Sequence, residues 1–212
     1  MRKTIHVEGI PGSGKTTAAT QLCELLRNKG VDAHWYLEES VDHPIMPDHR
    51  RALSGKSGFP QICMNAWQEF LNASDRTVVL DGYAFQSTVR FLYANLVEQK
   101  VIEEYFQQWQ ALSPNTTVVF FVVEDPYTHF EVVFSERGAD WTGKLFDYVE
   151  NTPMGVTNNF HGKSGFVEFW SRYQQLCREL LDTAHVPVAL LNARSWTEAD
   201  LEDLAISCEL LS

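Results

Sequence analysis

Three glycines lead into a lysine and a threonine near the start of the chain, in the segment GIPGSGKTT over residues 9–17. The spacing G-x-x-x-x-G-K-T is the Walker A pattern, and it stands between an apolar run and an amphipathic stretch, as that pattern requires. Glycines let a backbone wrap closely, so that successive N–H groups and the start of a helix face an anion. We expect Lys15 to reach the β- and γ-phosphates of a nucleotide and the Thr16 hydroxyl to bind Mg²⁺.

This segment predicts a nucleotide site, with ATP and Mg²⁺ as the expected ligands. The alternative is a glycine-rich turn that caps a core helix. The predicted nucleotide-binding residues are Gly9, Pro11, Gly12, Ser13, Gly14, Lys15, Thr16 and Thr17.

Two adjacent glutamates, Glu38 and Glu39, follow the apolar segment Ala33–Leu37. A carboxylate at the end of the strand after a phosphate loop can accept the proton of a hydroxyl that receives a phosphoryl group. Neighbouring side chains on an extended chain point in different directions, so we expect one of the two to act in this way. A solvated strand end is the other interpretation.

Asp81 ends a third apolar segment, Thr77–Asp81, and a stretch with helical spacing that includes Phe85 and Val89 follows it. At this position a carboxylate could hold Mg²⁺ through water or orient the acceptor. The alternative is a helix N-cap, a role for which Asp is well suited in any protein.

Five short apolar segments alternate with amphipathic stretches along the chain. This order predicts a parallel sheet covered on both faces, and ligands of such sheets bind beyond the carboxyl ends of the strands. The sequence therefore predicts an α/β protein with a three-layer P-loop NTPase fold and a five-stranded parallel sheet. The expected strands are Thr4–Glu8, Ala33–Leu37, Thr77–Asp81, Thr117–Val123 and Val186–Leu191.

The 212 residues carry a formal net charge of −11, which argues against a nucleic-acid partner because such binding depends on a basic face. The length fits one domain over residues 1–212. We expect no membrane partner, since the longest apolar run, Val118 to Val123, is too short to span a bilayer. The early Walker A pattern leaves no room for a signal peptide, and the scattered cysteines fit reduced thiols, so we expect a cytoplasmic protein.

Together these motifs resemble the superfamily of thymidylate kinases and deoxyribonucleoside kinases. The shared features are the Walker A segment, a glutamate after the second strand, and DGYAFQST (residues 81–88) after the third. The wider pattern WYLEESVDHP…DGYAFQSTVR…YVENTP is also similar to a group of bacterial thymidylate kinase-like proteins. The resemblance covers most of the chain in the order of its elements. It implies a nucleoside- or nucleotide-kinase-like fold with a small lid over about residues 136–165.

Those kinases carry an arginine directly after the aspartate, where this chain has Gly82. In the resembling enzymes that arginine contacts a substrate phosphate, so the exchange calls the usual acceptors into question. Arg90 lies about two helical turns further on, which we expect to be too far along the helix to substitute. Arg50 and Arg51 are the better candidates, because the loop before the third strand borders the acceptor in the resembling fold.

Arg137 ends a segment that Asp125 and Pro126 begin with the signals of a helix start. Resembling kinases have a mobile lid here, whose arginines close over the phosphates and stabilise the charge that develops during transfer. The resemblance implies this role for Arg137 first and Lys144 second, and an ordinary surface turn is the alternative. The segment 192–194 occupies the place where such folds line the adenine.

The sequence thus predicts an ATP- and Mg²⁺-dependent phosphotransferase that moves the γ-phosphate to a small-molecule acceptor, nucleoside- or nucleotide-like. One alternative is a nucleotide-dependent switch, although the sequence holds no NKxD-like guanine signature. Another is a kinase for an antibiotic or other secondary metabolite. A homodimer is compatible with the sequence. The predicted catalytic residues are Lys15, Glu38, Glu39, Asp81 and Arg137, and the predicted metal ligands are Thr16 and Asp81.

Overall fold

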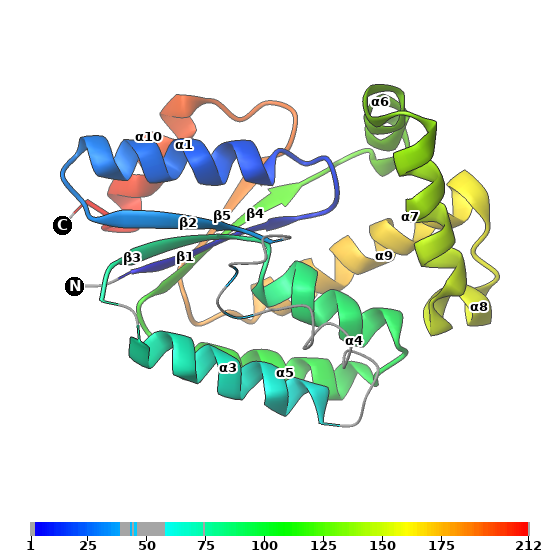
Figure 1. The fold of residues 1–212 in the computed structure, drawn as a ribbon, viewed down its shortest axis with the longest axis horizontal. Helices are drawn as coiled ribbons and strands as arrows, with labels where there is room; N and C mark the ends of the chain where they lie inside the picture. The colour runs from blue at the N-terminus through cyan, green and yellow to red at the C-terminus, as the bar shows by residue number, and fades with distance from the viewer. Residues whose placement is uncertain (1–2, 39–42, 44, 46–57, 74, 212) are drawn as a thin grey trace.

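Five parallel strands form one sheet at the centre of the molecule, in the order β2-β3-β1-β4-β5 (Figure 1). This computed structural model describes residues 3–38, 43, 45, 58–73 and 75–211. The strands are β1 (Thr4–Gly9), β2 (Ala33–Leu37), β3 (Thr77–Asp81), β4 (Thr116–Val122) and β5 (Val188–Asn192). Because all five run the same way, their carboxyl ends meet at one edge of the sheet.

Helices cover both faces of the sheet and extend past one edge (Figure 1). One face carries α1 (Lys15–Asn28) and α10 (Glu198–Ser207). The opposite face carries α3 (Phe59–Ala73), η1 (Ala84–Val89), α4 (Arg90–Ala94), α5 (Gln99–Ala111) and α9 (Gly162–Asp182). Beyond the carboxyl ends of the strands lie α6 (Pro126–Arg137), α7 (Ala139–Asn151) and α8 (Pro153–Asn158).

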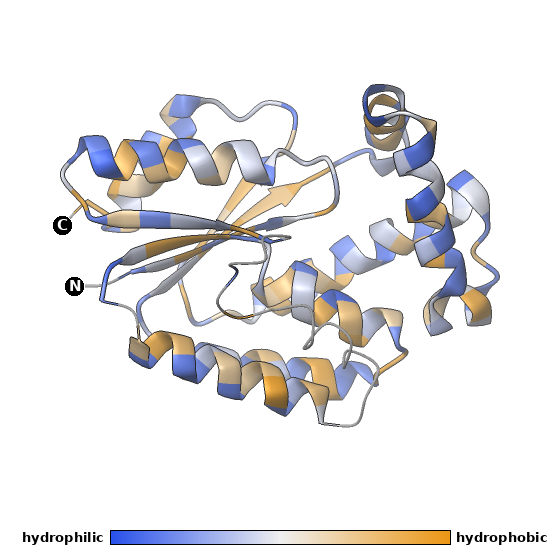
Figure 2. Ribbon diagram, viewed as in Figure 1, coloured by the Kyte–Doolittle hydropathy of each residue, from blue (hydrophilic) through white to orange (hydrophobic). Residues whose placement is uncertain are grey.

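Strand residues divide between two hydrophobic cores according to their parity along the chain. Ile5 and Val7 of β1 pack with α1 and α10, whereas Val78 and Leu80 of β3 belong to the core on the α3–α5 side. This division is the two-residue period of an extended chain, and it explains why the strands read as nearly continuous apolar runs. Figure 2 shows hydrophobic stretches in the central strands, between helices that carry hydrophilic residues on their outer faces. The predicted α/β architecture with a five-stranded parallel sheet is confirmed.

Element boundaries follow the sequence signals within about two residues, as is usual for helix and strand ends. The first helix ends at Asn28, just before Gly30, whose φ of +87° suits a glycine after a helix. Thr197 and Asp200 form a capping box at the start of α10. Asp125 caps α6 by accepting a hydrogen bond from the Thr128 amide at 3.0 Å.

The helix expected after Asp81 has an irregular start. Residues Ala84–Val89 form a π-helix, which continues directly into the short α4. Leu96 lies beyond the end of α4, with a φ of +56°. A π-helical turn holds more residues than an α-helical one, so the side chains that follow it are rotated around the axis.

Residues 136–165, the predicted lid region, are largely helical. They include the end of α6, all of α7 and α8, and the beginning of α9. An aromatic cluster of Phe134, Phe146 and Phe166 joins α6, α7 and α9, with ring centroids 5.2–5.5 Å apart. All four cysteines are free thiols. No helix among the residues described here is long and apolar enough to cross a membrane.

Candidate active site

The phosphate loop connects β1 to the first turn of α1. Gly12 and Gly14 have φ values of +77° and +93°, which favour glycine. A side chain at Gly12 would also clash, since its Cβ would lie 2.4 Å from Cγ2 of Val133. Helix α1 starts at Lys15 without an acidic residue in its first turn. Its amide groups and positive dipole end therefore face the loop, an arrangement suited to phosphate.

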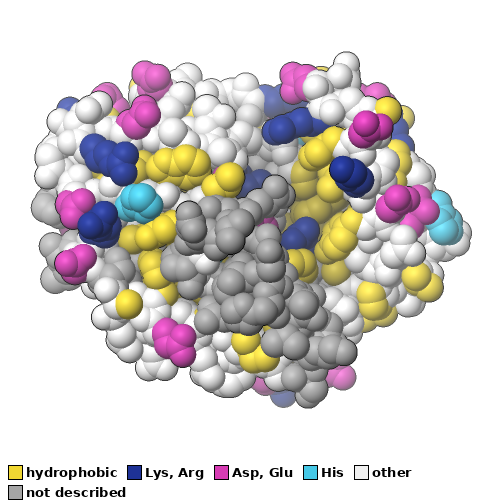
Figure 3. All heavy atoms as spheres, in the orientation of Figure 1, with side chains coloured by type: hydrophobic (Ala, Val, Ile, Leu, Met, Phe, Trp, Pro, Cys, Tyr) yellow, Lys and Arg dark blue, Asp and Glu magenta, His cyan; other side chains and the backbone are white. Residues whose placement is uncertain are grey.

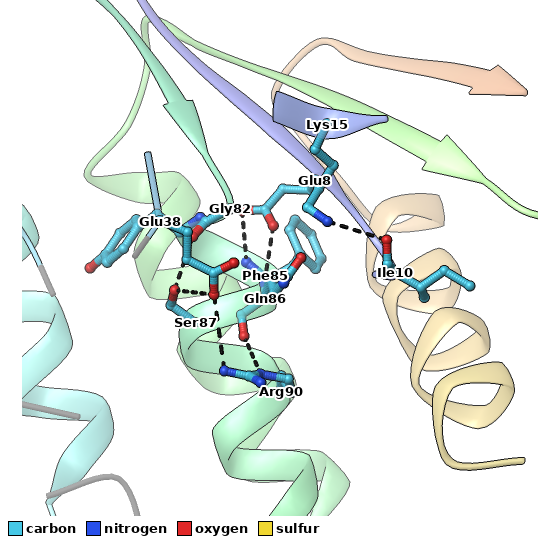
Figure 4. Close-up of polar contacts among 10 residues, drawn as sticks. Glu8, Ile10, Lys15, Glu38, Gly82, Phe85, Gln86, Ser87 and Arg90 are labelled. Atoms are coloured by element: carbon cyan, nitrogen blue, oxygen red, sulfur yellow. Dashed lines mark hydrogen bonds and ion pairs between the residues drawn. The ribbon is translucent and has the colours of Figure 1, made fainter. Parts of the chain in front are cut away.

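Lys15 and Thr16 both point toward the carboxyl ends of the central strands. Lys15 is buried, and its ammonium group donates a hydrogen bond to the Ile10 carbonyl at 3.2 Å (Figure 4). The Thr16 hydroxyl donates to Oδ2 of Asp81 at 2.6 Å. Asp81 therefore lies beside the phosphate loop, and the N-cap interpretation is wrong because other groups cap the following helix.

The cap of that helix is Glu8, a residue that sequence reasoning missed. Its Oε1 accepts hydrogen bonds from the amides of Tyr83 at 2.8 Å and Phe85 at 3.1 Å, and its Oε2 accepts one from Gln86 at 3.0 Å (Figure 4). Burial raises the pKa of Glu8 to about 7, against the opposing effect of these amides. The available signal was a charged residue within a fully buried strand.

Glu38, the residue after β2, turns inward instead of facing solvent. Its side chain is 12% exposed, and its Oε1 accepts a hydrogen bond from the Ser87 hydroxyl at 3.0 Å. Burial raises its pKa, while Arg90 and Lys15 favour the charged form. The solvated strand end considered for this position is therefore wrong. The carboxylate can act on a group held between β2 and η1.

Arg90 reaches the Glu38 carboxylate, although we expected it to lie too far along the helix to take the place of the arginine of the resembling kinases. Its Nη2 lies 4.0 Å from Oε1 of Glu38, and its Nε donates to the Gln86 carbonyl at 2.7 Å (Figure 4). The π-helical start of the segment contributes to this result, because it rotates the residues that follow. Glu39, Arg50 and Arg51 lie outside the described residues.

One face of α6 contacts the phosphate loop at Pro11 and Gly12. Nε2 of His129 lies 2.9 Å from the Pro11 carbonyl, and Val133 packs against Gly12. Arg137 follows at the same four-residue spacing and therefore lies further along this face. Its exposed guanidinium lies 5.7 Å from the ring centroid of Trp141. Lys144 is exposed on α7.

A cavity of about 350 Å³ lies between the end of β4, the start of α6 and the loop after β5. Its lining includes Asn192 and Arg194, two of the residues proposed to line the adenine, together with Asp125 and Thr128. The guanidinium of Arg194 donates to the Thr128 carbonyl at 3.0 Å and so joins the two walls. Next in the loop, the Trp196 indole approaches Gly14 of the phosphate loop. The cavity is thus a candidate site for a nucleotide base.

A hollow opens on the same side of the molecule. In Figure 3, hydrophobic side chains line it beside α6 and α7, and Lys or Arg atoms lie within it. The view agrees with a site whose charged groups lie inside walls of apolar side chains.

No family model matches the chain, and no curated protein matches it. Among solved structures, the chain is similar to the YorR protein of Bacillus subtilis, crystallised in complex with phosphorylated GDP, with a TM-score of 0.53. The fold is nucleotide kinase-like. The two sequences are 15% identical, and the match covers 98% of this chain and 96% of YorR. The likeness therefore supports the predicted fold class over nearly the whole chain.

The oxygen donors beside the phosphate loop suit Mg²⁺. Thr16 and Asp81 bring a hydroxyl and a carboxylate into direct contact, and Mg²⁺ prefers oxygen ligands. Among the residues that the structure describes, no three His, Cys, Asp or Glu side chains form a cluster that could hold a metal. The fit is thus to an ion shared with phosphate oxygens and water, as is usual for Mg²⁺.

Proposed function

We propose that this protein is an ATP- and Mg²⁺-dependent phosphotransferase that moves the γ-phosphate to a nucleoside- or nucleotide-like small molecule. One observation carries the proposal. Lys15 follows β1, Asp81 ends β3 and Glu38 follows β2, so a phosphate ligand, a metal ligand and an acid–base group gather at the ends of three adjacent strands. Phosphoryl transfer requires these three groups and little else beyond correct positioning.

The donor half of the site is the phosphate loop. Amides of residues 9–17 bind the phosphates, and Lys15 neutralises charge on the β- and γ-phosphates after leaving the Ile10 carbonyl. The cavity beside Arg194 takes the nucleotide base. YorR, a protein of similar fold, was crystallised with phosphorylated GDP, which supports a nucleotide as the ligand.

Thr16 and Asp81 hold the metal. Mg²⁺ supplies charge neutralisation at the phosphate oxygens when it is bound. Asp81 is buried and already hydrogen-bonded to Thr16, so the two ligands need little rearrangement to bind one ion together.

The acceptor half of the site is built around Glu38. A carboxylate that is nearly buried and paired with Ser87 is well placed to accept the proton of an acceptor hydroxyl, or to orient that hydroxyl. Arg137, from the far end of α6, approaches the transferred group and stabilises its charge during transfer.

Incubation with Mg·ATP and a panel of nucleosides, nucleoside monophosphates, sugars and aminoglycosides tests the proposal. Mass spectrometry should detect one compound that gains a phosphoryl group. Lys15→Ala should abolish this product while the protein stays folded, because the lysine contacts the transferred phosphate. Lys29→Ala, which changes an exposed lysine at the other end of α1, is the matched control and should retain activity.

Two results would contradict the proposal. Full transfer by Lys15→Ala would remove the phosphate loop from the reaction. ATP loss that no compound of the panel accelerates, but that a protein partner does, would indicate a nucleotide switch instead.

A further inference from the structure

Arg90 occupies a fixed position between the acceptor side of the site and the helices beyond it. It is the first residue of α4, directly after the π-helix, and it binds the Gln86 carbonyl of the preceding turn at 2.7 Å. From there its Nη2 approaches Oε1 of Glu38 to 4.0 Å. One side chain thus connects the helix after β3 to the carboxylate after β2.

Three aromatic rings from three helices surround the guanidinium. Its central carbon lies 4.5 Å from the ring centroid of Phe91 on α4, 5.2 Å from that of Tyr148 on α7, and 5.9 Å from that of Trp170 on α9. The Arg90 side chain is only 17% exposed. Guanidinium groups pack well on aromatic faces, and this packing restricts a side chain that otherwise has many rotamers.

Glu38 depends on such a partner because it is removed from water. Its side chain is 12% exposed. Oε1 accepts a hydrogen bond from the Ser87 hydroxyl and lies 4.0 Å from Nη2 of Arg90. Oε2 faces the α-carbon of Gly82, where a Cβ would lie 3.0 Å away. Without the nearby cation, a buried carboxylate becomes protonated or turns toward solvent.

We propose that Arg90 is the positioning residue of the acceptor side: it holds the Glu38 carboxylate toward the acceptor, from a guanidinium fixed by the rings of α4, α7 and α9. The inference rests on the proposed function, in which Glu38 acts on the acceptor. It also makes the orientation of Glu38 sensitive to α7, since Tyr148 contributes one of the three rings.

Kinetics of single and double variants test this role, with the panel compound that gains a phosphoryl group as the acceptor. Arg90→Met should lower kcat by about 10- to 100-fold, because small displacements of a catalytic group have effects of this size. The KM for ATP should stay within about twofold, since the contacts that the structure describes for Arg90 lead to Glu38, Gln86 and aromatic rings, outside the phosphate loop. Arg90→Lys should recover part of kcat, because it restores the charge but not the planar stacking.

The double variant separates positioning from a general structural role. In the Glu38→Gln background, Arg90→Met should cause no further loss of kcat beyond about twofold, because residues that act as a unit are not additive. Arg172→Met is the matched control. Arg172 also pairs with a glutamate, Glu168, and lies over the ring of Phe160, but none of its contacts among the described residues involves Glu38. It should retain wild-type kcat.

Thermal unfolding gives a measurement that needs no acceptor. Arg90→Met should lower Tm more in the wild-type background than in the Glu38→Gln background, because only the former removes a cation from beside a buried carboxylate. Wild-type kcat in Arg90→Met, independent kcat losses in the double variant, or equal Tm losses in both backgrounds would each overturn the inference. If no panel compound is phosphorylated, the proposed function fails, whereas unequal Tm losses still support the pairing of Arg90 with Glu38.

Discussion

The α-carbon of Gly82 lies against the carboxylate of Glu38. A Cβ at this position would stand 3.0 Å from Oε2 of Glu38, and the φ of +71° is itself unfavourable for any other residue. A side chain at the place where the resembling kinases carry an arginine would therefore be strained in this protein and would crowd the Glu38 carboxylate. Arg90 brings a guanidinium to the same carboxylate from further along the chain.

Gly82→Ala should lower stability by about 1 kcal/mol through backbone strain and should also lower kcat by about tenfold, because the methyl group displaces the Glu38 carboxylate. Gly30→Ala is the matched control. Its φ is +87°, but a Cβ there would meet nothing within 4 Å. Urea unfolding should show similar losses for both variants, and steady-state kinetics should show a loss for Gly82→Ala alone. Wild-type kcat in Gly82→Ala would show that the position of the Glu38 carboxylate does not affect catalysis.

Arg137→Ala should lower kcat by about 100-fold or more if its guanidinium stabilises the transferred group, as arginines do in other phosphoryl transfers. Arg178→Ala, a change at an exposed position of α9, should have no effect. Steady-state kinetics at saturating ATP compare the two. Equal activities would assign Arg137 to an ordinary surface turn.

His129→Phe should weaken binding of Mg·ADP by about fivefold, the equivalent of about 1 kcal/mol for one lost hydrogen bond. Burial lowers the pKa of His129, so the ring is neutral near pH 7, and Nε2–H can donate to the Pro11 carbonyl that it approaches to 2.9 Å. Isothermal titration calorimetry measures the affinity. His161→Phe, at a side chain that is 64% exposed, is the control and should bind normally. An unchanged affinity in His129→Phe would show that the loop needs no support from α6.

His6 should make the protein sensitive to acid. Burial, with a smaller effect from His43, lowers the pKa of His6 to about 3, and neither ring nitrogen has a hydrogen-bond partner among the described residues. In the unfolded chain His6 becomes protonated near pH 6.5, whereas in the folded chain it becomes protonated only near pH 3. The free energy of unfolding should therefore fall as the pH decreases between these values.

His6→Phe should remove this part of the acid sensitivity, which is on the order of a few kcal/mol. Urea unfolding of both proteins at pH 7 and pH 4.5 provides the comparison. Glu8, with its pKa raised to about 7, acts in the opposite direction but is present in both proteins and cancels. Identical losses in the two proteins would show that His6 is not the titrating group.

Most of the fold could be predicted from local sequence signals. Buried parallel strands and capped helices are determined by patterns within a few residues, and the phosphate loop is a contiguous motif, so both could be predicted. The position of Arg90 could not be predicted. It depends on a π-helical turn, for which there is no known residue pattern, and on rings from α7 and α9 that are distant in sequence. The charge of Glu8 within an apolar strand was a local signal. Its role as a cap was not, because the three amides that it binds lie about 75 residues further along the chain.

The hydrogen bonds of Glu8 bear on how the proposed reaction must be organised in space. Glu8 immediately precedes Gly9 of the phosphate loop, and its carboxylate anchors the turn that leads to Ser87 and Arg90. Separating the two halves of the site would break three hydrogen bonds at once, two of them buried and one partly buried. In the proposed reaction, the gap between the donor and acceptor sides is therefore set when the chain folds, before either substrate arrives. An acceptor too large for that gap would not be accommodated by widening it.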